Sequence, residues 1–354
     1  MNKRNTVVLR WASPISSVMV LVALFTIPPV VLASSGSSVT CSFDEGTHTV
    51  TVTIDQVFFF GGLTNTNGEI RLTAGSQQAT DCGTSTVTNT DTVIINDVTP
   101  PPGPGGGLAT ASIDIVPDGG AWGPGFSDEP GASDEIEFVI NLGAPGSAPG
   151  FHGDTVGFDG SASQVASTMV LGGDQANLNA DEVDGVDADV VLDGVEAFEF
   201  RGNQFNDSVD GSGGAGTPTA GYEGRILAFG RGGNDVLTGG SGGSSLVGSN
   251  GNDVLVGSVG GDGLEGGSGK DVIRGGPAND SLIGGHGSDF ILGGSGRDRG
   301  WGVAGNDRLR GQADSDDLLG GLDNDRLDGG PGRDGCDGGA GTNALKSCER
   351  ESRL

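Results

Sequence analysis

The sequence predicts an all-β protein, and three observations carry this prediction. Short segments alternate apolar residues with threonine or aspartate, as half-buried strands do, and no segment shows a helical period of useful length. Glycine accounts for 70 of 354 residues, yet no Gly-x-y triplet recurs, which excludes collagen. In the C-terminal part, glycine, aspartate and an aliphatic residue return every nine residues.

The charge of the chain limits the classes of partner. The formal net charge is −29, and the few basic residues are scattered, so we expect no nucleic-acid partner. An acidic chain of this kind favours cations or solvation instead. After the N-terminal segment no run is apolar enough to cross a bilayer, so we expect no membrane span in the mature chain.

Residues 1–33 are expected to be a secretory signal peptide. A basic beginning precedes the apolar run 16–27, and small residues lead to Ala33 at the expected cleavage position. Because the apolar run is short and is followed by Pro28–Pro29, an uncleaved membrane anchor is disfavoured. We therefore expect a secreted, extracellular protein. The basic residues at the beginning of this signal peptide are Lys3, Arg4 and Arg10.

The four cysteines all lie in the part of the chain that would be exported. An oxidising compartment favours disulfides, and pairing neighbours in the sequence joins Cys41 with Cys82 and Cys336 with Cys348. No CxxC motif and no Cys/His cluster occurs, so a zinc site is not expected.

Residues 34–98 predict a small β module stapled by Cys41–Cys82. Alternating valine, isoleucine and threonine in 47–55 predicts a strand, and the preceding Asp44–Gly46 indicates a hairpin turn. A further strand is expected over 91–98. Residues 99–107, TPPPGPGGG, have the composition of a linker.

Residues 108–229 predict an acidic, irregular β region. Residues 34–229 together hold 28 acids against three arginines. The stretch 181–211 is dense in aspartate beside apolar strands, and two interpretations of it stay open: further coils with irregular cation sites, or an acidic solvated face. The expected strands of the region are 111–116, 135–142, 188–192 and 195–200.

The nonapeptide repeat occupies residues 230–345 without an insertion. In a frame that starts at Gly230, position 1 is Gly in all thirteen units, position 6 is Asp in eleven, position 8 is Leu or Ile in eleven and position 4 is Gly in ten. Disorder has no need of periodic aliphatic residues, so a flexible acidic tail is disfavoured. The exceptions are Ser244 and Asn343 at position 6, and Gly300 and Cys336 at position 8.

The repeat resembles the G-G-x-G-x-D-x-U-x nonapeptide of the hemolysin-type calcium-binding proteins, the RTX repeats. The resemblance implies a parallel β-roll in which six residues of each unit form a turn and three form a strand. Two units complete one coil, so the turns alternate between two sides. It also implies several calcium ions, each between turns of one side and each bound by aspartates from units two apart.

The residue types suit such a roll independently of the resemblance. Glycine at positions 1, 2 and 4 permits the backbone of tight turns, and the aliphatic residue at position 8 can fill a thin core. Calcium takes carboxylate and carbonyl oxygens, which aspartate and the turns supply. The predicted metal ligands are Asp235, Asp253, Asp262, Asp271, Asp280, Asp289, Asp298, Asp307, Asp316, Asp325 and Asp334.

The eighteen-residue spacing sorts these aspartates into two ladders. The first begins at Asp235 and ends in Asn343, and the second begins at Ser244 and ends at Asp334. Consecutive Asp–Asp pairs allow nine full sites. Departures from glycine at positions 2 and 4 predict weaker sites nearby, above all the site that uses Asp280, because Ala278 stands at position 4. Other departures include Arg231, Val303, Gln312, Asp314 and Asp323.

Residues 346–354 predict a C-terminal cap and tail, with Cys336–Cys348 closing the last coil. The function expected is that of a secreted calcium-binding protein that folds on extracellular calcium and serves as a structural or interaction module, with a cell-surface or matrix partner. The alternative is a carbohydrate-active or hydrolytic enzyme with its site in 108–229. A pore-forming toxin is disfavoured because an apolar membrane segment is missing. We expect no enzyme and name no catalytic residue, and the question stays open for 108–229, where a catalytic carboxylate pair cannot be selected from so many acids.

Overall fold

The structure is a computed structural model that describes residues 197–213 and 221–352 continuously and, before residue 197, only the strands. Strands and no helix occur in these residues, which confirms the all-β prediction. The same residues therefore contain no helix long and apolar enough to cross a membrane. The predicted signal peptide lies outside the described residues except for its last four, which belong to strand β1. The chain forms two compact units: Met1–Ser163, Gly173–Glu199 and Ala215–Pro218 in the first, and Gln164–Gly172, Phe200–Gly214 and Thr219–Leu354 in the second.

The first unit contains two groups of paired strands. Strands β1, β2 and β3 pair antiparallel, and β3, β7 and β9 continue this sheet in parallel. In the other group β4 pairs with β5 and β8, β5 with β6, and β8 with β10. The expected hairpin before 47–55 is thus present as β2–β3. The bounds are β1 Val30–Ser34, β2 Ser37–Asp44, β3 Thr49–Asp55, β4 Phe58–Thr66, β5 Glu69–Ala74, β6 Thr80–Thr86, β7 Thr92–Asp97, β8 Thr110–Val116, β9 Glu137–Asn141, β10 Thr155–Asp159, β12 Gln175–Asn177 and β13 Val190–Val191.

Strands from the predicted module 34–98 pair with strands from the predicted region 108–229. Strand β7 lies parallel to β9, and β4 lies parallel to β8. The residues of the predicted linker 99–107 lie outside the described residues, and the boundaries assigned from the sequence stay predictions. Cys41 is buried and disulfide-bonded. The side chain of Cys82 is outside the described residues, so its pairing with Cys41 also stays a prediction.

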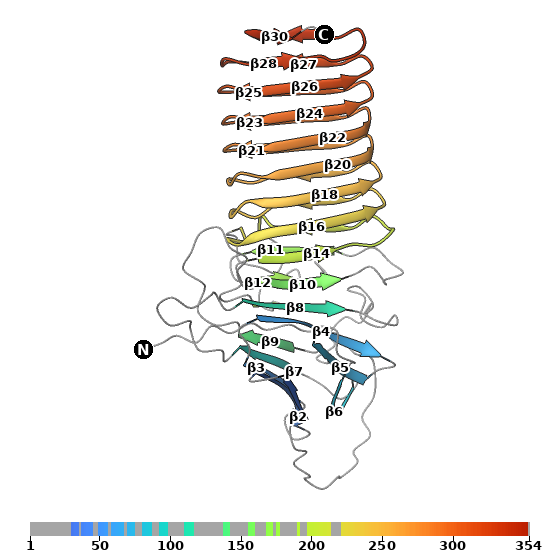
Figure 1. Ribbon diagram of the computed structural model, residues 1–354, viewed down its shortest axis with the longest axis vertical. Coiled ribbons are helices and arrows are strands. Elements are labelled where there is room, and N and C mark those ends of the chain that lie inside the picture. Colours follow the sequence, from blue (N-terminus) through green and yellow to red (C-terminus); the bar gives the residue numbers. More distant parts are fainter. Residues whose placement is uncertain are drawn as a thin grey trace, which may run out of the picture. The chain divides into compact units, whose positions relative to one another are not determined.

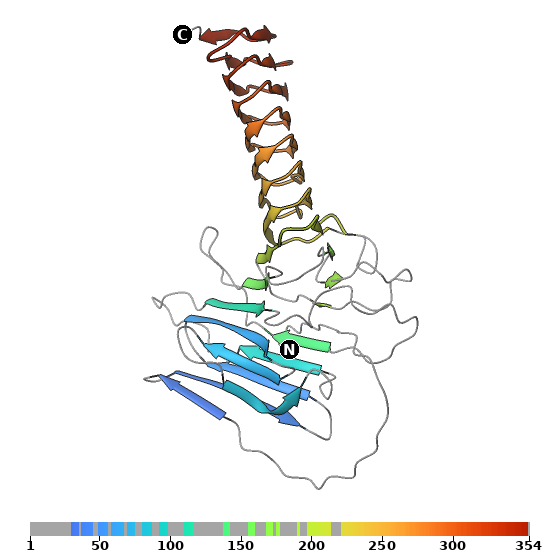
Figure 2. The same cartoon turned by 90° about the vertical axis from the view of Figure 1, so that its right-hand side faces the viewer.

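The second unit is a parallel β-solenoid with two layers of strands, as the repeat predicted (Figures 1 and 2). Even-numbered strands form one layer: β16 Arg225–Gly232, β18 Ser244–Asn250, β20 Gly263–Gly269, β22 Ser281–Gly287, β24 Arg299–Ala304, β26 Asp317–Leu322, β28 Gly335–Asp337 and β30 Arg350–Ser352. The other layer contains β11 Thr168–Gly172, β15 Ser208–Asp210, β17 Val236–Thr238, β19 Val254–Val256, β21 Val272–Pro277, β23 Phe290–Ser295, β25 Arg308–Ala313, β27 Arg326–Asp328 and β29 Ala344–Lys346. Strand β14, Ala197–Arg201, spans the boundary between the units.

Equivalent residues of successive coils pair at a spacing of eighteen. Leu264 pairs with Leu282, for example, and Ile273 pairs with Ile291. Two nonapeptides therefore complete one coil, as the resemblance implied. The strands from β20 to β26 are longer than the expected three residues, because pairing resumes after position 9 and continues through the glycine positions, as in Gly267 with Gly285. Others, such as β17, β19 and β27, have the expected three residues.

The core is a thin column of position-8 side chains between the two layers. Leu255, Ile273 and Leu282 are completely buried, and the outward neighbours at positions 7 and 9 are partly exposed. Gly300 leaves its place in the column without a side chain. Leu318 and Leu309 close this place, because a Cβ on Gly300 would lie 3.2 and 3.4 Å from their methyl groups. A larger side chain at position 300 would therefore require the two leucines to repack.

Several turns keep a left-handed backbone where glycine is replaced. Ala278 has a φ of 82° and Val303 a φ of 84°. The turn before Asp280 therefore retains the left-handed conformation that a glycine would adopt there. Such a conformation costs an L-amino acid about 1–2 kcal/mol, so the solenoid imposes it on these residues. The other non-glycine residues with positive φ are Arg231, Ser249, Gln312, Asp314, Asp323 and Ser347.

The solenoid begins before Gly230. Residues 202–210 follow the nonapeptide frame, with Gly202 at position 1, Asp207 at position 6 and buried Val209 at position 8. Strand β15 pairs in parallel with β17 at a spacing of 28 instead of eighteen, so ten additional residues separate the first coil from the regular array. Because of this insertion, the unit 202–210 lies outside the nine-residue frame that starts at Gly230.

Core and surface positions of one strand should differ strongly in their sensitivity to truncation. We expect Ile273→Ala to lower the free energy of unfolding by about 2–4 kcal/mol, because it removes a completely buried side chain. Val272→Ala, on the outer face of the same strand, should cost less than about 1 kcal/mol. Urea unfolding followed by circular dichroism in calcium measures both, and equal costs would contradict the two-layer arrangement.

Replacing Val303 by glycine, which adopts a positive φ without strain, should stabilise the solenoid. Its side chain is 42% exposed, so Val303→Gly loses little burial and removes an unfavourable φ. We expect a gain of about 0.5–1.5 kcal/mol in the free energy of unfolding. Val259→Gly, at a 64% exposed valine without positive φ, is the control and should be neutral or destabilising. Stabilisation by both substitutions, or by neither, would refute this account.

Candidate metal centre

All eleven aspartates predicted as ligands are buried in the turns of the solenoid. None is more than 3% exposed, although aspartate is almost never fully buried without a partner. They stand in two rows, as the eighteen-residue spacing predicts. The first ladder contains Asp235, Asp253, Asp271, Asp289, Asp307 and Asp325, and the second contains Asp262, Asp280, Asp298, Asp316 and Asp334.

One carboxylate oxygen of each aspartate binds the backbone of the preceding coil. The N–H of Asp271 donates to Oδ1 of Asp289 at 2.9 Å, and the N–H of Asp280 donates to Oδ1 of Asp298 at 2.9 Å. The same bond recurs throughout both ladders. The parallel register produces this regularity, because it places each aspartate directly beside its equivalent in the next coil.

The second carboxylate oxygen is buried and has no hydrogen-bond donor in ten of the eleven aspartates. The exception is Asp262, whose Oδ2 accepts the N–H of Ser258 at 2.6 Å. A buried acceptor without a donor costs about 1–3 kcal/mol, and more when it is charged. These orphaned oxygens therefore require a compensating positive group. They belong to Asp235, Asp253, Asp271, Asp280, Asp289, Asp298, Asp307, Asp316, Asp325 and Asp334.

A backbone carbonyl from the next coil lies beside nine of the ten orphaned oxygens, next to the position-1 glycine. A methyl-sized group on Gly284 would lie 2.5 Å from Oδ2 of Asp289 and 3.0 Å from the carbonyl oxygen of Gly302. Two acceptors thus converge with no donor between them. Calcium binds carboxylate and carbonyl oxygens in this combination, so the residues present fit a calcium ion. No group of three or more acidic, histidine or cysteine side chains that could hold a metal ion gathers among the described residues, the ladders included, so backbone carbonyls would have to complete the coordination.

Burial raises the pKa of the ladder carboxyl groups. Loss of water is the main cause and neighbouring carboxylates add to it, whereas the backbone hydrogen bond lowers the pKa. The pKa rises to about 7 for Asp235, Asp289 and Asp298, and to about 6 for Asp253, Asp280, Asp307 and Asp316. The pKa values of Asp262, Asp271, Asp325 and Asp334 are also raised. A cation that enters the ladders must therefore displace protons.

The first ladder extends one coil beyond the predicted ligands. The N–H of Asp207 donates to Oδ1 of Asp235 at 2.7 Å, and the N–H of Asn203 donates to Oδ2 of Asp207 at 2.7 Å. Sequence reasoning named no residue here, although the motif GNQFNDSVD carries the signal. The second ladder ends differently, because Ile226 pairs with Ser244 and occupies the equivalent position in the preceding coil. An apolar residue therefore closes its N-terminal end.

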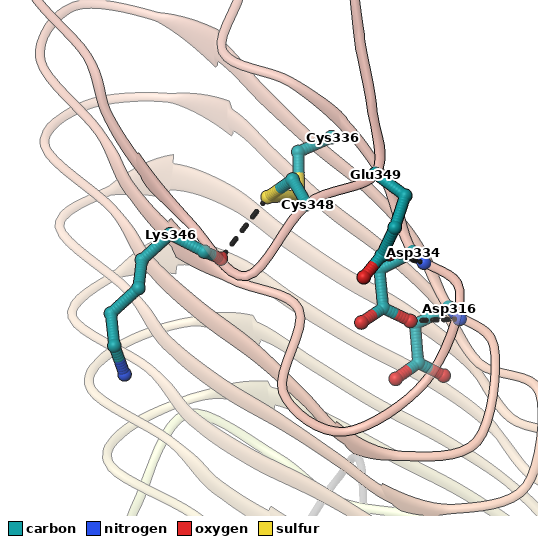
Figure 3. The surroundings of a disulfide bond; sticks show 6 residues. All are labelled: Asp316, Asp334, Cys336, Lys346, Cys348 and Glu349. Atoms are coloured by element: carbon teal, nitrogen blue, oxygen red, sulfur yellow. Dashed lines mark hydrogen bonds between the residues drawn. A yellow bond between two sulfur atoms is a disulfide. The ribbon is translucent and has the colours of Figure 1, made fainter.

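The C-terminal ends of both ladders carry substitutes for aspartate. Oδ1 of Asn343 accepts the N–H of Asp325 at 2.8 Å. Oε2 of Glu349 accepts the N–H of Asp334 at 2.5 Å (Figure 3). Glu349 follows Asp334 by 15 residues, so the last coil is three residues shorter than the others. The disulfide Cys336–Cys348, with a Cα–Cα distance of 5.8 Å, closes this shortened coil.

Asparagines at position 5 form a further row that sequence reasoning missed. Oδ1 of Asn252 accepts the N–H of Lys270 at 2.9 Å, and Oδ1 of Asn279 accepts the N–H of Arg297 at 2.7 Å. These bonds run from the later coil to the earlier one, opposite to the aspartate ladders. Where position 5 is asparagine, its side chain thus satisfies a turn N–H, and the aspartate carboxylate is left for the interior.

Acidification should stabilise the solenoid when calcium is absent. Folded-state pKa values near 6–7 exceed the ordinary value of 3.8, so the folded state binds more protons than the unfolded state between these limits. Stability then rises as the pH falls from about 7.5 to about 5. Circular dichroism in EDTA from about pH 7.5 to about pH 5 checks this, because the β signal of the array should increase as the pH falls. With calcium present the trend should reverse, since protons compete for the same oxygens. A metal-free solenoid that weakens steadily with acid would contradict the assigned burial.

Comparison with known families agrees with this geometry. Residues 229–345 match the model of the RTX calcium-binding nonapeptide repeat, in overlapping matches to 229–264, 265–300, 293–327, 301–336 and 311–345. A search of curated proteins finds no match to the chain. Repeats of this type bind calcium, which agrees with the buried carboxylate and carbonyl oxygens of the turns. The C-terminal third of the chain is therefore an array of RTX calcium-binding nonapeptide repeats.

Proposed function

We propose that the chain is a secreted protein whose solenoid folds when it meets extracellular calcium and then serves as a structural or interaction module. The observation that carries this proposal is the pair of acceptors in nine of the turns, in which a buried Oδ2 without a donor lies beside a backbone carbonyl. The predicted signal peptide and the disulfide-bonded cysteines support export to an oxidising compartment.

The calcium concentration outside cells is sufficient for such a switch. Extracellular modules bind calcium with a Kd of about 10⁻⁴–10⁻³ M. At about 1 mM calcium each site then contributes roughly 0.4–1.4 kcal/mol by mass action. Nine Asp–Asp sites sum to roughly 4–13 kcal/mol, which is comparable with the stability of a whole domain. At submicromolar calcium this contribution vanishes, so we expect the array to be disordered before export.

A rigid solenoid suits a structural or interaction role. Once folded, each coil holds its position-7 and position-9 side chains on a flat outer face, at the regular spacing of parallel strands. A partner at the cell surface or in the matrix could contact several coils together. No observation in the described residues favours the enzymatic alternative for 108–229. RTX repeats are typically structural, calcium-binding elements.

Asparagine substitution in a ladder should separate metal binding from hydrogen bonding. In Asp289→Asn the remaining Oδ1 still accepts the N–H of Asp271, as Asn343 does naturally for Asp325. We expect fewer calcium ions bound in calorimetry and a calcium midpoint for folding raised about threefold to tenfold. In EDTA the folded state of the same variant should be less unfavourable than that of the unmodified chain, because a buried carboxylate has been removed, and its β signal in circular dichroism should be at least as large.

Asp337→Asn is the matched control. Oδ1 of Asp337 also accepts a backbone N–H, from Gly339 at 3.0 Å, but the residue lies outside the ladders. It should change neither the calcium midpoint nor the number of ions bound. A β spectrum in circular dichroism that is the same in EDTA and in calcium would overturn the proposal that calcium folds the array. Equal effects of both asparagine substitutions would overturn the assignment of the ladders.

A further inference from the structure

We propose that a groove across strands β16 to β24 of the solenoid binds a linear anionic polysaccharide. The groove has a volume of 630 Å³ and is lined by residues of five successive coils on one layer. It crosses the strands and therefore runs along the solenoid axis. An extended chain can lie in such a groove, whereas a compact ligand would contact only one part of it.

The groove exists because three coils carry very small residues at their outward positions. Ser245, Gly263 and Ser281 occupy position 7 of successive coils and line the groove, together with Gly261 at position 5. A Cβ built on Gly263 would meet no atom within 4 Å. Gly263 also lacks a positive φ, so the turn does not require glycine at this place. The open floor is therefore a property of the surface, and the fold does not demand it.

Arginines stand at both ends of the groove. Arg225 lies at one end, and Arg297 and Arg299 lie at the other, four coils away, which is roughly 19 Å at about 4.8 Å per coil. Arg297 forms an ion pair with Asp317 at 2.7 Å. Arg299 lies opposite Asp317 in the strand register but forms no ion pair with it, and no ion pair involves Arg225 within the described part of the chain. In a chain of net charge −29, two exposed guanidinium groups that form no ion pair are suited to capture anionic groups.

The middle of the groove offers hydrogen bonds and no apolar side chain. Ser245 and Ser281, at the outward position 7, contribute hydroxyl groups to the lining. Oδ1 of Asn279 accepts the N–H of Arg297, which leaves the amide NH₂ available to donate. Hydroxyl and amide groups between cationic ends fit a chain that carries both hydroxyl and anionic groups. The groove has no apolar pocket of the kind that usually anchors a peptide, so an acidic peptide fits it less well.

Two buried aspartates lie beneath the same groove and affect its charge. Asp262 and Asp280 belong to the second ladder and contribute to the lining. Without a cation their carboxylates would repel an anion, so the inference rests on the proposed calcium loading of this ladder. Anion binding should therefore be stronger in calcium than in EDTA.

The test measures fluorescence anisotropy of labelled dextran sulfate oligomers with the full chain in calcium. Carboxymethyl-dextran oligomers form a second anionic arm, which distinguishes sulfate from carboxylate as the preferred group, and unmodified dextran is the neutral control. We expect at least one anionic dextran to bind and unmodified dextran not to bind. Arg225→Gln and Arg299→Gln should each weaken binding about tenfold, which corresponds to 1.4 kcal/mol.

Two further variants keep the test specific. Arg308→Gln removes the same charge from β25, on the other layer, and should leave the affinity unchanged. Gly263→Val fills the floor without straining the backbone and should abolish binding. Equal losses from Arg308→Gln and Arg299→Gln would overturn the groove as the site, and so would unchanged binding by Gly263→Val. Tighter binding of a polyglutamate peptide than of either dextran would overturn the polysaccharide assignment.

Circular dichroism of the same samples separates the two proposals. If calcium folds the chain and no anionic dextran binds, this inference fails and the proposed function stands. If calcium neither binds nor folds the chain, the proposed function fails first, whatever the dextrans do.

Discussion

The eighteen-residue parallel register is the constraint on which the rest of the solenoid depends. It places each position-6 aspartate beside its equivalent one coil away, so Oδ1 of Asp289 can accept the N–H of Asp271 at 2.9 Å. The same register stacks Ile273 on Ile291 in the core. It also brings turn backbones so close that a Cβ at Gly287 would overlap the carbonyl oxygen of Gly269. Core, turns and ladders are therefore consequences of one spacing.

The register also creates a cost that the protein cannot remove by itself. Stacking one carboxylate per turn satisfies one oxygen and buries the other against a backbone carbonyl, with no donor available for ten aspartates. The thin core, one aliphatic side chain per nonapeptide, supplies limited compensation. The raised pKa values of the ladder carboxyl groups express the same imbalance. A calcium ion or a proton can relieve it, which makes the stability of the array a function of its surroundings.

Much of the solenoid could be predicted from the repeat, because a strict nine-residue period leaves few arrangements open. The two layers, the alternation of turns and the burial of the position-8 residues follow from it. The sequence-based prediction did not identify the residues at the ends of the two aspartate ladders. Asp207 belongs to the first ladder, but ten additional residues displace it from the frame. Glu349 completes the second ladder at a spacing of 15, which only the shortened, disulfide-closed coil makes possible.

By itself the sequence determined the all-β class, the eighteen-residue unit and the identity of the eleven aspartates, because these depend on periodicity and residue type. Only the tertiary structure decided which atoms of those aspartates remain without partners. Hydrogen bonds between coils consume Oδ1 and leave Oδ2, and no one-dimensional pattern contains that distinction. The groove between Arg225 and Arg299 is likewise a tertiary feature: residues 74 positions apart in the chain become the two ends of one surface only when the coils stack.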